Sequence, residues 1–94
     1  MPKPNLDKDK KLLVDTLRKL KFSKDLSNFL DDLFTEEEIL DLAQRIKIAK
    51  SILDGKTYDE IAEKVGTSTS TVSKIGQVIK YGKGGLQKVL KKKF

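Results

Sequence analysis

The fold of this chain is decided by one stretch, Tyr58-Asp-Glu-Ile-Ala-Glu-Lys-Val-Gly-Thr-Ser-Thr-Ser-Thr-Val-Ser-Lys-Ile-Gly-Gln77, which suits two short helices that meet at a tight corner. Ala62 is small enough to let the second helix approach the first. Gly66 is expected to end the first helix, because that position needs a positive φ, which glycine adopts without steric cost. The spacing predicts a helix-turn-helix at about 57–80. Its apolar residues face one core: Ile61, Val65, Val72 and Ile75.

The sequence before this stretch predicts three more helices and contains no strand pattern. Apolar residues at helical spacing predict a first helix at about 7–21, after residues 1–6, which we expect to be disordered. Ser23 is the expected N-cap of a second helix. Thr35-Glu-Glu-Glu38 has the pattern of a capping box, and it opens a long third helix that Gly55 ends.

A second capping box, Thr57-Tyr-Asp-Glu60, opens the helix-turn-helix, and Ser68 is the expected N-cap of its second helix, at about 69–80. Glycines at 82–85 indicate a turn before a last short helix and a basic tail at 91–94. The tail carries three lysines that are candidates for phosphate contacts, and a tail that is only solvated is the alternative; they are Lys91, Lys92 and Lys93. We therefore expect an all-α fold of six helices, with residues 7–94 forming a single domain.

The apolar stripes of the first two helices are wide for a chain of 94 residues. Such a chain buries only about two thirds of its unfolded surface, so one copy has little core with which to cover both stripes. Oligomerisation would bury them, and a loosely packed monomer is the alternative. The stripe residues are Leu12, Leu13, Leu17 and Leu20, then Leu26, Phe29, Leu30 and Leu33; the third helix adds Ile39, Leu42, Ala43, Ile46, Ala49, Ile52 and Leu53.

Composition excludes several kinds of chemistry. The chain has no cysteine and no histidine, so it has no disulfide, and zinc sites, histidine bases and Ser-His-Asp triads are not available. Acidic residues such as Asp59, Glu60 and Glu63 fall in the first turns of helices, where they meet the helix dipole favourably. We therefore expect that the protein is not an enzyme and that it binds neither a metal ion nor a cofactor.

No apolar run approaches the roughly 20 residues that a membrane span requires. The segment Met1–Asp7 has no apolar run of the kind found in signal peptides. We therefore expect a cytoplasmic, nucleoid-associated protein that does not enter a membrane.

The net charge of +6 is concentrated in the last part of the chain. Residues 57–94 hold eight basic and three acidic side chains, a net charge of +5. Basic faces bind phosphate by releasing counterions, so this coincidence of charge and motif indicates double-stranded DNA as the partner. A lysine-rich solubilising surface is the alternative.

If the second helix of the motif enters the major groove, its exposed positions carry recognition. Gln77 has the geometry to read adenine, and Lys74 can reach guanine or phosphate. Lys80, Lys83 and Lys88 are candidates for phosphate contacts. Helix capping is the favoured role of Ser68, and a solvated face is the alternative for the other hydroxyls. The candidate DNA-binding residues are Ser68, Thr69, Ser70, Ser73, Lys74, Gln77, Lys80 and Lys83.

The order of these elements resembles the Trp repressor superfamily over about residues 20–90. The chain is similar to the Trp-repressor-like YerC/YecD family in its Gly55-Lys-Thr-Tyr-Asp-Glu-Ile-Ala62 segment and in the Tyr81-Gly82 pair after the second helix. The resemblance implies an intertwined homodimer whose N-terminal helices interlock, with one reading head per subunit. It also implies a two-fold operator with half-sites about one helical turn apart.

The resemblance implies a tryptophan pocket that this chain matches only in part. Thr35, Arg45 and Thr71 fall at pocket positions, but a pocket glycine is Ile75 here, and a pocket serine is Val78. A branched side chain in that volume would cost about 1–3 kcal/mol by overpacking. We therefore expect a vestigial pocket filled by the protein's own side chains, no small-molecule effector, and an ion pair as the role of Arg45.

These observations favour a homodimeric, sequence-specific regulator of transcription, a repressor that does not require tryptophan. One alternative is a protein-interaction module that uses the helix-turn-helix as a docking surface. Another is a tryptophan-dependent repressor.

Overall fold

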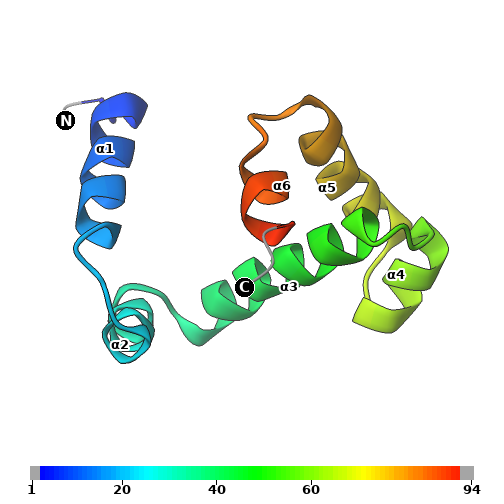
Figure 1. Ribbon diagram of the computed structural model, residues 1–94, viewed down its shortest axis with the longest axis horizontal. Helices are drawn as coiled ribbons and strands as arrows, with labels where there is room; N and C mark the ends of the chain where they lie inside the picture. Colours follow the sequence, from blue (N-terminus) through cyan, green and yellow to red (C-terminus); the bar gives the residue numbers. More distant parts are fainter. Residues whose placement is uncertain (1–2, 92–94) are drawn as a thin grey trace. The chain divides into compact units, whose positions relative to one another are not determined.

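The computed structural model describes residues 3–91, and this part of the chain consists of six α-helices without a strand (Figure 1). The predicted all-α class is therefore confirmed. The tail residues Lys92 and Lys93 lie outside the described range. The helices are α1 (Leu6–Leu17), α2 (Ser23–Leu33), α3 (Glu36–Leu53), α4 (Tyr58–Val65), α5 (Thr69–Tyr81) and α6 (Gly85–Leu90).

The chain divides into two compact units, Met1–Ile39 and Leu40–Phe94, with the boundary inside α3. Each unit is described by itself below. The prediction of a single domain over residues 7–94 stays a prediction.

α1 is shorter than its predicted range of 7–21. It begins at Leu6, after the Asn5 side chain accepts a hydrogen bond from the backbone N–H of Lys8 at 3.1 Å. It ends at Leu17, because the Lys19 and Leu20 N–H groups bond to carbonyls three residues back and tighten the last turn. The predicted end of this helix was therefore wrong by about one turn.

The predicted cap of α2 was wrong by one residue. Ser23 is the first residue of the helix, and the extended residue Phe22 is the N-cap, without a side-chain capping bond. The Phe22 carbonyl accepts the first hydrogen bond of the helix, from the Leu26 N–H at 3.0 Å. A shift of one residue leaves the apolar stripe of α2 in place.

Neither α1 nor α2 contains a buried residue. Leu12 is 68% exposed and Leu26 is 40% exposed, although both belong to the predicted apolar stripes. Packing between α1 and α2 within the first unit therefore leaves these stripes exposed.

α3 begins at the predicted capping box and ends at the predicted glycine. The Thr35 hydroxyl oxygen accepts from the Glu38 N–H at 3.2 Å, and the Glu38 carboxylate accepts from the Thr35 N–H at 2.9 Å. At the other end, Gly55 has a φ of +84°. Its N–H bonds to the Ile52 carbonyl, and the next N–H, that of Lys56, bonds to the Ser51 carbonyl, so two orphan carbonyls are satisfied.

The core of the second unit lies where α3, α4 and α5 meet. Ile48, Ile61, Ala62 and Val72 are buried together. The predicted apolar face of α3 omitted Ile48, which is fully buried, and included Ile46, which is 45% exposed. The face of α3 that meets the other helices is therefore rotated from the predicted stripe. Partly buried residues pack against this core: Ile52, Tyr58, Val65 and Ile75.

Candidate nucleic-acid interface

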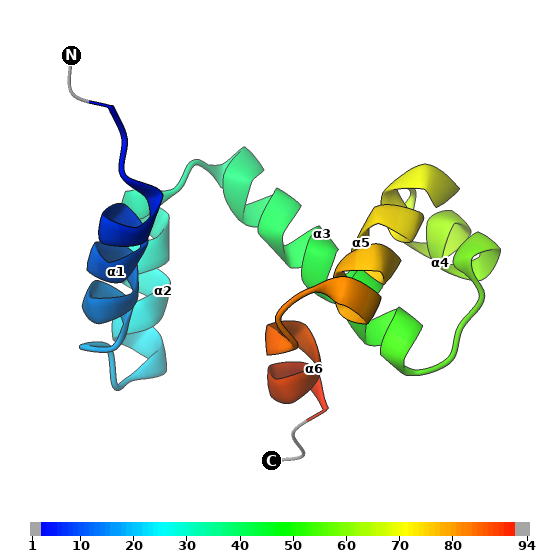
Figure 2. The ribbon, with the colours of Figure 1, turned by 90° about the horizontal axis from the view of Figure 1, so that it is seen from above.

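α4 and α5 form the helix-turn-helix corner and lie side by side in both views (Figures 1 and 2). Gly66 ends α4 with a φ of +80°, and both its N–H and that of Thr67 bond to the Ala62 carbonyl. The predicted role of Gly66 is therefore confirmed. The Ser68 hydroxyl then caps α5 by accepting from the Thr71 N–H at 3.2 Å, as predicted.

The capping box predicted at the start of α4 is half formed. The Thr57 hydroxyl oxygen accepts from the Glu60 N–H at 3.2 Å. Within residues 3–91, no return bond from the Thr57 N–H to the Glu60 carboxylate accompanies it. One of the four orphan N–H groups of α4 is thus satisfied by a side chain.

A close contact between Tyr58 and Gly76 fixes the distance between α4 and α5. The Tyr58 ring packs against the core, and a Cβ placed on Gly76 would overlap the tyrosine hydroxyl and lie 3.0 Å from its Cζ. Gly76 is buried in the middle of α5, where a glycine disfavours the helix. The sequence reading missed this pair, although a glycine inside a helical pattern is a known signal of close packing.

The predicted recognition residues share one face of α5. Ser70, Ser73, Lys74 and Gln77 follow the spacing i, i+3, i+4 and i+7, which places them on the same side of a helix. Ser73 is half-buried, and the other three are exposed. This face therefore presents hydroxyl, ammonium and amide groups to solvent.

The remaining candidates lie at the two ends of α5. Ser68 and Thr69 are exposed at its N-terminus, where the Ser68 hydroxyl is already committed to the cap. Lys80 is exposed in the last turn, and Lys83 is exposed in the turn that follows. Lys80 lies three residues after Gln77 and seven after Ser73, so it continues the same face of α5, and Lys83 follows in the turn.

The turn after α5 depends on a second close approach. A Cβ on Gly82 would overlap the Val78 carbonyl oxygen, so a residue larger than glycine does not fit there. The Gln87 side-chain amide donates to the Ile79 carbonyl and ties α6 to α5. This hydrogen bond was not predicted, because side-chain partners across a turn have no local sequence signal.

The residues of the predicted vestigial pocket have other partners or none. Thr35, in the first unit, caps α3, and the Thr71 hydroxyl lies 3.1 Å from that of Ser68. Arg45 is exposed. Within residues 3–91 an ion pair joins Lys11 to Asp15, and the ion pair predicted for Arg45 is not formed. Ile75 packs against the core of the second unit. The side chain at the critical pocket position is thus part of the helix-turn-helix packing.

Fold and corner together define a helix-turn-helix protein of the all-α class. The sequence model of the Trp repressor protein family matches residues 8–94, and the chain belongs to this family. It is a family of helix-turn-helix DNA-binding regulators and not a family of enzymes.

Individual relatives agree with this assignment. The chain is 35% identical over 78 residues to the uncharacterised protein YerC of Bacillus subtilis, covering 83% of this chain and 75% of YerC. A TrpR-like protein from Eubacterium eligens, whose crystal structure is known, has 36% sequence identity to this chain. The two structures superpose with a TM-score of 0.80 over 86% of this chain and 84% of that one. A Trp repressor candidate from Staphylococcus aureus has 32% sequence identity to this chain. Its crystal structure matches with a TM-score of 0.79 over 94% of this chain and 86% of that one.

Neither a membrane-spanning helix nor a metal-binding cluster occurs in the described residues. Between residues 3 and 91, no helix is long and apolar enough to cross a membrane. The same part of the chain holds no group of three acidic side chains placed to bind a metal ion.

Proposed function

We propose that the protein is a sequence-specific, double-stranded DNA-binding regulator of transcription, a repressor that acts as a homodimer on the nucleoid in the cytoplasm. The observation that carries the proposal is the exposed polar face of α5, held on a rigid corner in a chain of this family. In the complex, α5 enters the major groove, and Ser70, Ser73, Lys74 and Gln77 meet base edges and the flanking phosphates.

Charge supports the same orientation. Residues 57–94 carry a net charge of +5, and Lys80 and Lys83 are exposed along the end of α5. These two lysines serve as phosphate contacts, which fix the register of a protein on the duplex without reading its sequence. The N-terminus of α5, with Ser68 and Thr69, adds a favourable site for a phosphate oxygen.

The exposed stripes of α1 and α2 support the homodimer. Burial of a leucine side chain stabilises a protein by about 1.5–3 kcal/mol, so several exposed leucines favour association strongly. A two-fold dimer would present two copies of α5 to half-sites about one helical turn apart. Docking of a different protein on these stripes is the second candidate.

Selection of bound sequences from a random duplex library, at about physiological salt, tests the function. We expect a palindromic consensus, because a two-fold dimer reads a two-fold site. Replacement of Gln77 by alanine should relax one position of that consensus and cost about 1–3 kcal/mol of binding free energy. Lys80→Gln should instead weaken binding to all sequences and reduce the salt slope by about one.

Two results would contradict the proposal. Salt-sensitive binding without a consensus would leave a non-specific DNA binder. Absence of binding, with the stripes still associating with a second protein, would favour the interaction module.

The proposal includes independence from tryptophan, and a thermal melt tests it. Ile75 packs against the core, so it is not free to make room for an indole ring. A ligand at 100 times its Kd stabilises a protein by about 2.7 kcal/mol, which raises the Tm of a domain of this size by roughly 10 °C or more. We expect no such rise with millimolar L-tryptophan. A clear rise, or a consensus that appears only with tryptophan, would restore the corepressor mechanism.

A further inference from the structure

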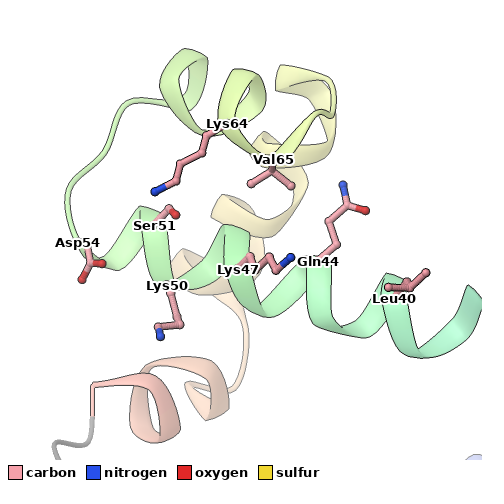
Figure 3. Close-up of a pocket in the computed structure, with 8 residues that line it drawn as sticks. All are labelled: Leu40, Gln44, Lys47, Lys50, Ser51, Asp54, Lys64 and Val65. Atoms are coloured by element: carbon pink, nitrogen blue, oxygen red, sulfur yellow. The ribbon is translucent and has the colours of Figure 1, made fainter. Parts of the chain in front are cut away.

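A groove of about 560 Å³ lies between α3 and the C-terminal end of α4, within the second unit (Figure 3). Lys64 extends from α4 toward Ser51 of α3, and Lys47 lies beside Gln44 on the neighbouring turns of α3 (Figure 3). Lys50 extends from the opposite edge of α3, away from α4. The side chains of Lys47 and Lys64, from two helices, therefore border this hollow, whereas Lys50 lines it with its ammonium group turned away from α4.

Two carboxylates lie near the lysines of this groove: Asp54 lines it, and Glu60 lines a neighbouring hollow that shares Ser51, Asp54 and Lys64 with it. Asp54 is the acidic side chain in its lining, against three lysines. Across residues 3–91, the recorded ion pair joins Lys11 to Asp15 in α1, so none of the groove lysines is paired. All three are exposed and keep their hydrogen-bond donors available. An anion entering the groove would meet a local excess of positive charge.

From this arrangement we propose that the α3–α4 groove binds a small phosphorylated molecule that carries hydroxyl groups. Its volume falls within the range of about 300–1,000 Å³ that is usual for small-molecule sites. Lys47 and Lys64 donate charge-assisted hydrogen bonds to the phosphate oxygens. Ser51 and Gln44 add neutral donors, and the Asp54 carboxylate accepts from a hydroxyl of the ligand.

The same phosphate chemistry occurs in the DNA backbone, but the geometry favours a free ligand. None of the residues that line the groove belongs to α5 or to its exposed polar face. The site is therefore distinct from the proposed reading surface, and it stands whether or not the protein binds DNA.

Titration of the free, ¹⁵N-labelled wild-type chain tests the site without DNA. The probes are ribose 5-phosphate, pyrophosphate and, as a control without phosphate, ribose. We expect saturable shifts of the backbone amide signals of Gln44, Ser51 and Lys64 with both phosphate probes. Ribose alone should leave them in place. Absence of shifts, or shifts that grow linearly and spread over all lysine-rich segments, would overturn the proposal.

A pair of matched variants separates the groove from general charge. Lys47→Gln with Lys64→Gln removes two charges from the groove, and Lys80→Gln with Lys83→Gln removes two from the α5 region. We expect affinity for ribose 5-phosphate to fall roughly tenfold or more in the first variant and to stay within about twofold in the second. Equal losses in both variants would show non-specific attraction and overturn the site.

Duplex binding by the same variants distinguishes the two sources of phosphate. If the groove variant weakens duplex binding and lowers its salt slope while the wild type binds neither phosphate probe, the groove contacts the DNA backbone and the proposal is wrong. All lysines involved are exposed, so both variants should keep the wild-type helical circular dichroism and Tm. The wild-type titration decides the question even if a variant unfolds.

Discussion

Gly76 has no side chain at the point where the hydroxyl of Tyr58 reaches α5. A glycine in the middle of a helix disfavours that helix by about 1 kcal/mol relative to alanine. Its presence at a buried position of α5 is therefore explained by the close approach of α4. This one contact sets how near the second helix of the corner can lie to the first.

Replacement of Gly76 by alanine should destabilise the protein despite the better helix propensity of alanine. Overpacking costs about 1–3 kcal/mol, and the rigid tyrosine ring cannot move aside without leaving the core. Gly85→Ala is the control, since nothing lies within 4 Å of a Cβ at that helical position. Urea unfolding of the two variants measures the difference. Removal of the hydroxyl in Tyr58→Phe should recover part of the loss; equal stability of G76A and G85A would contradict the argument.

Residues whose role is set by the local backbone could be predicted from the sequence. Gly66 and Ser68 belong to this group, because a positive φ and a helix N-cap each select a short list of residue types. Tyr58 and Gly76 could not be paired in advance, since they are 18 positions apart and meet only through packing. The candidate recognition residues were predicted as a list, and their shared face follows from the α-helix in which they lie; their role stays a prediction.

At the scale of single helices, the N-terminus of α3 carries a capping box with both of its hydrogen bonds formed. Thr35 and Glu38 exchange two hydrogen bonds across the first turn. The bond from the Thr35 backbone N–H to the carboxylate, followed by the effect of the Thr35 side chain, lowers the pKa of the Glu38 carboxyl below its ordinary value of 4.5. The charged carboxylate also faces the positive end of the helix dipole, which favours ionisation in the folded state.

The cap of α3 should therefore weaken in acid. Because the folded pKa of Glu38 is lowered, its contribution to stability is complete above pH 4.5 and is lost as the pH falls through the lowered pKa. Glu38→Gln keeps the accepting oxygen but removes the charge. We expect its Tm to lie below that of the wild type at pH 7 and the gap to close in acid.

Thermal melts between pH 7 and pH 3 measure this gap. Glu37→Gln is the matched control, since Glu37 lies in the same first turn and forms no capping bond recorded in the described chain. A gap between wild type and E38Q that stayed constant, or widened, on acidification would count against the ionised cap.

Helix boundaries were predictable where a cap marks them and not elsewhere. The start of α3 and both ends of α4 were predicted to the residue or nearly so. The end of α1 was missed, because no glycine or proline stands there and the stop comes from a tightened last turn. The apolar stripes of α1 and α2 were predicted from their spacing, although their helix boundaries were not predicted to the residue.

At the scale of the whole molecule, the described chain leaves much apolar surface uncovered. Leu12 and other stripe residues of α1 and α2 are exposed, although the sequence spaces them as a buried face would be. A stripe with this periodicity that its own unit leaves exposed is the kind of apolar surface that a partner covers. The homodimer proposed above supplies one.

The proposed dimer makes a direct prediction for Leu12→Gln combined with Leu17→Gln. Each leucine buried at the interface contributes about 1.5–3 kcal/mol, so the double variant should dissociate at concentrations where the wild type is dimeric. Sedimentation velocity at micromolar protein measures the two species. Lys11→Gln, on the opposite side of α1, is the control and should remain dimeric. A wild-type chain that sediments as a monomer at every concentration would exclude the homodimer.

The short connection between α4 and α5 has a consequence for the kinetics of folding. Only residues 66–68 separate α4 from α5, which pack side by side in the second unit. Closing so small a loop costs little chain entropy, and contacts between neighbours in sequence form on the fastest timescales of folding. The corner should therefore assemble early and without a partner. In the proposed homodimer, α1 and α2 are covered only after two molecules collide, so that model predicts a slow phase of refolding that is second order.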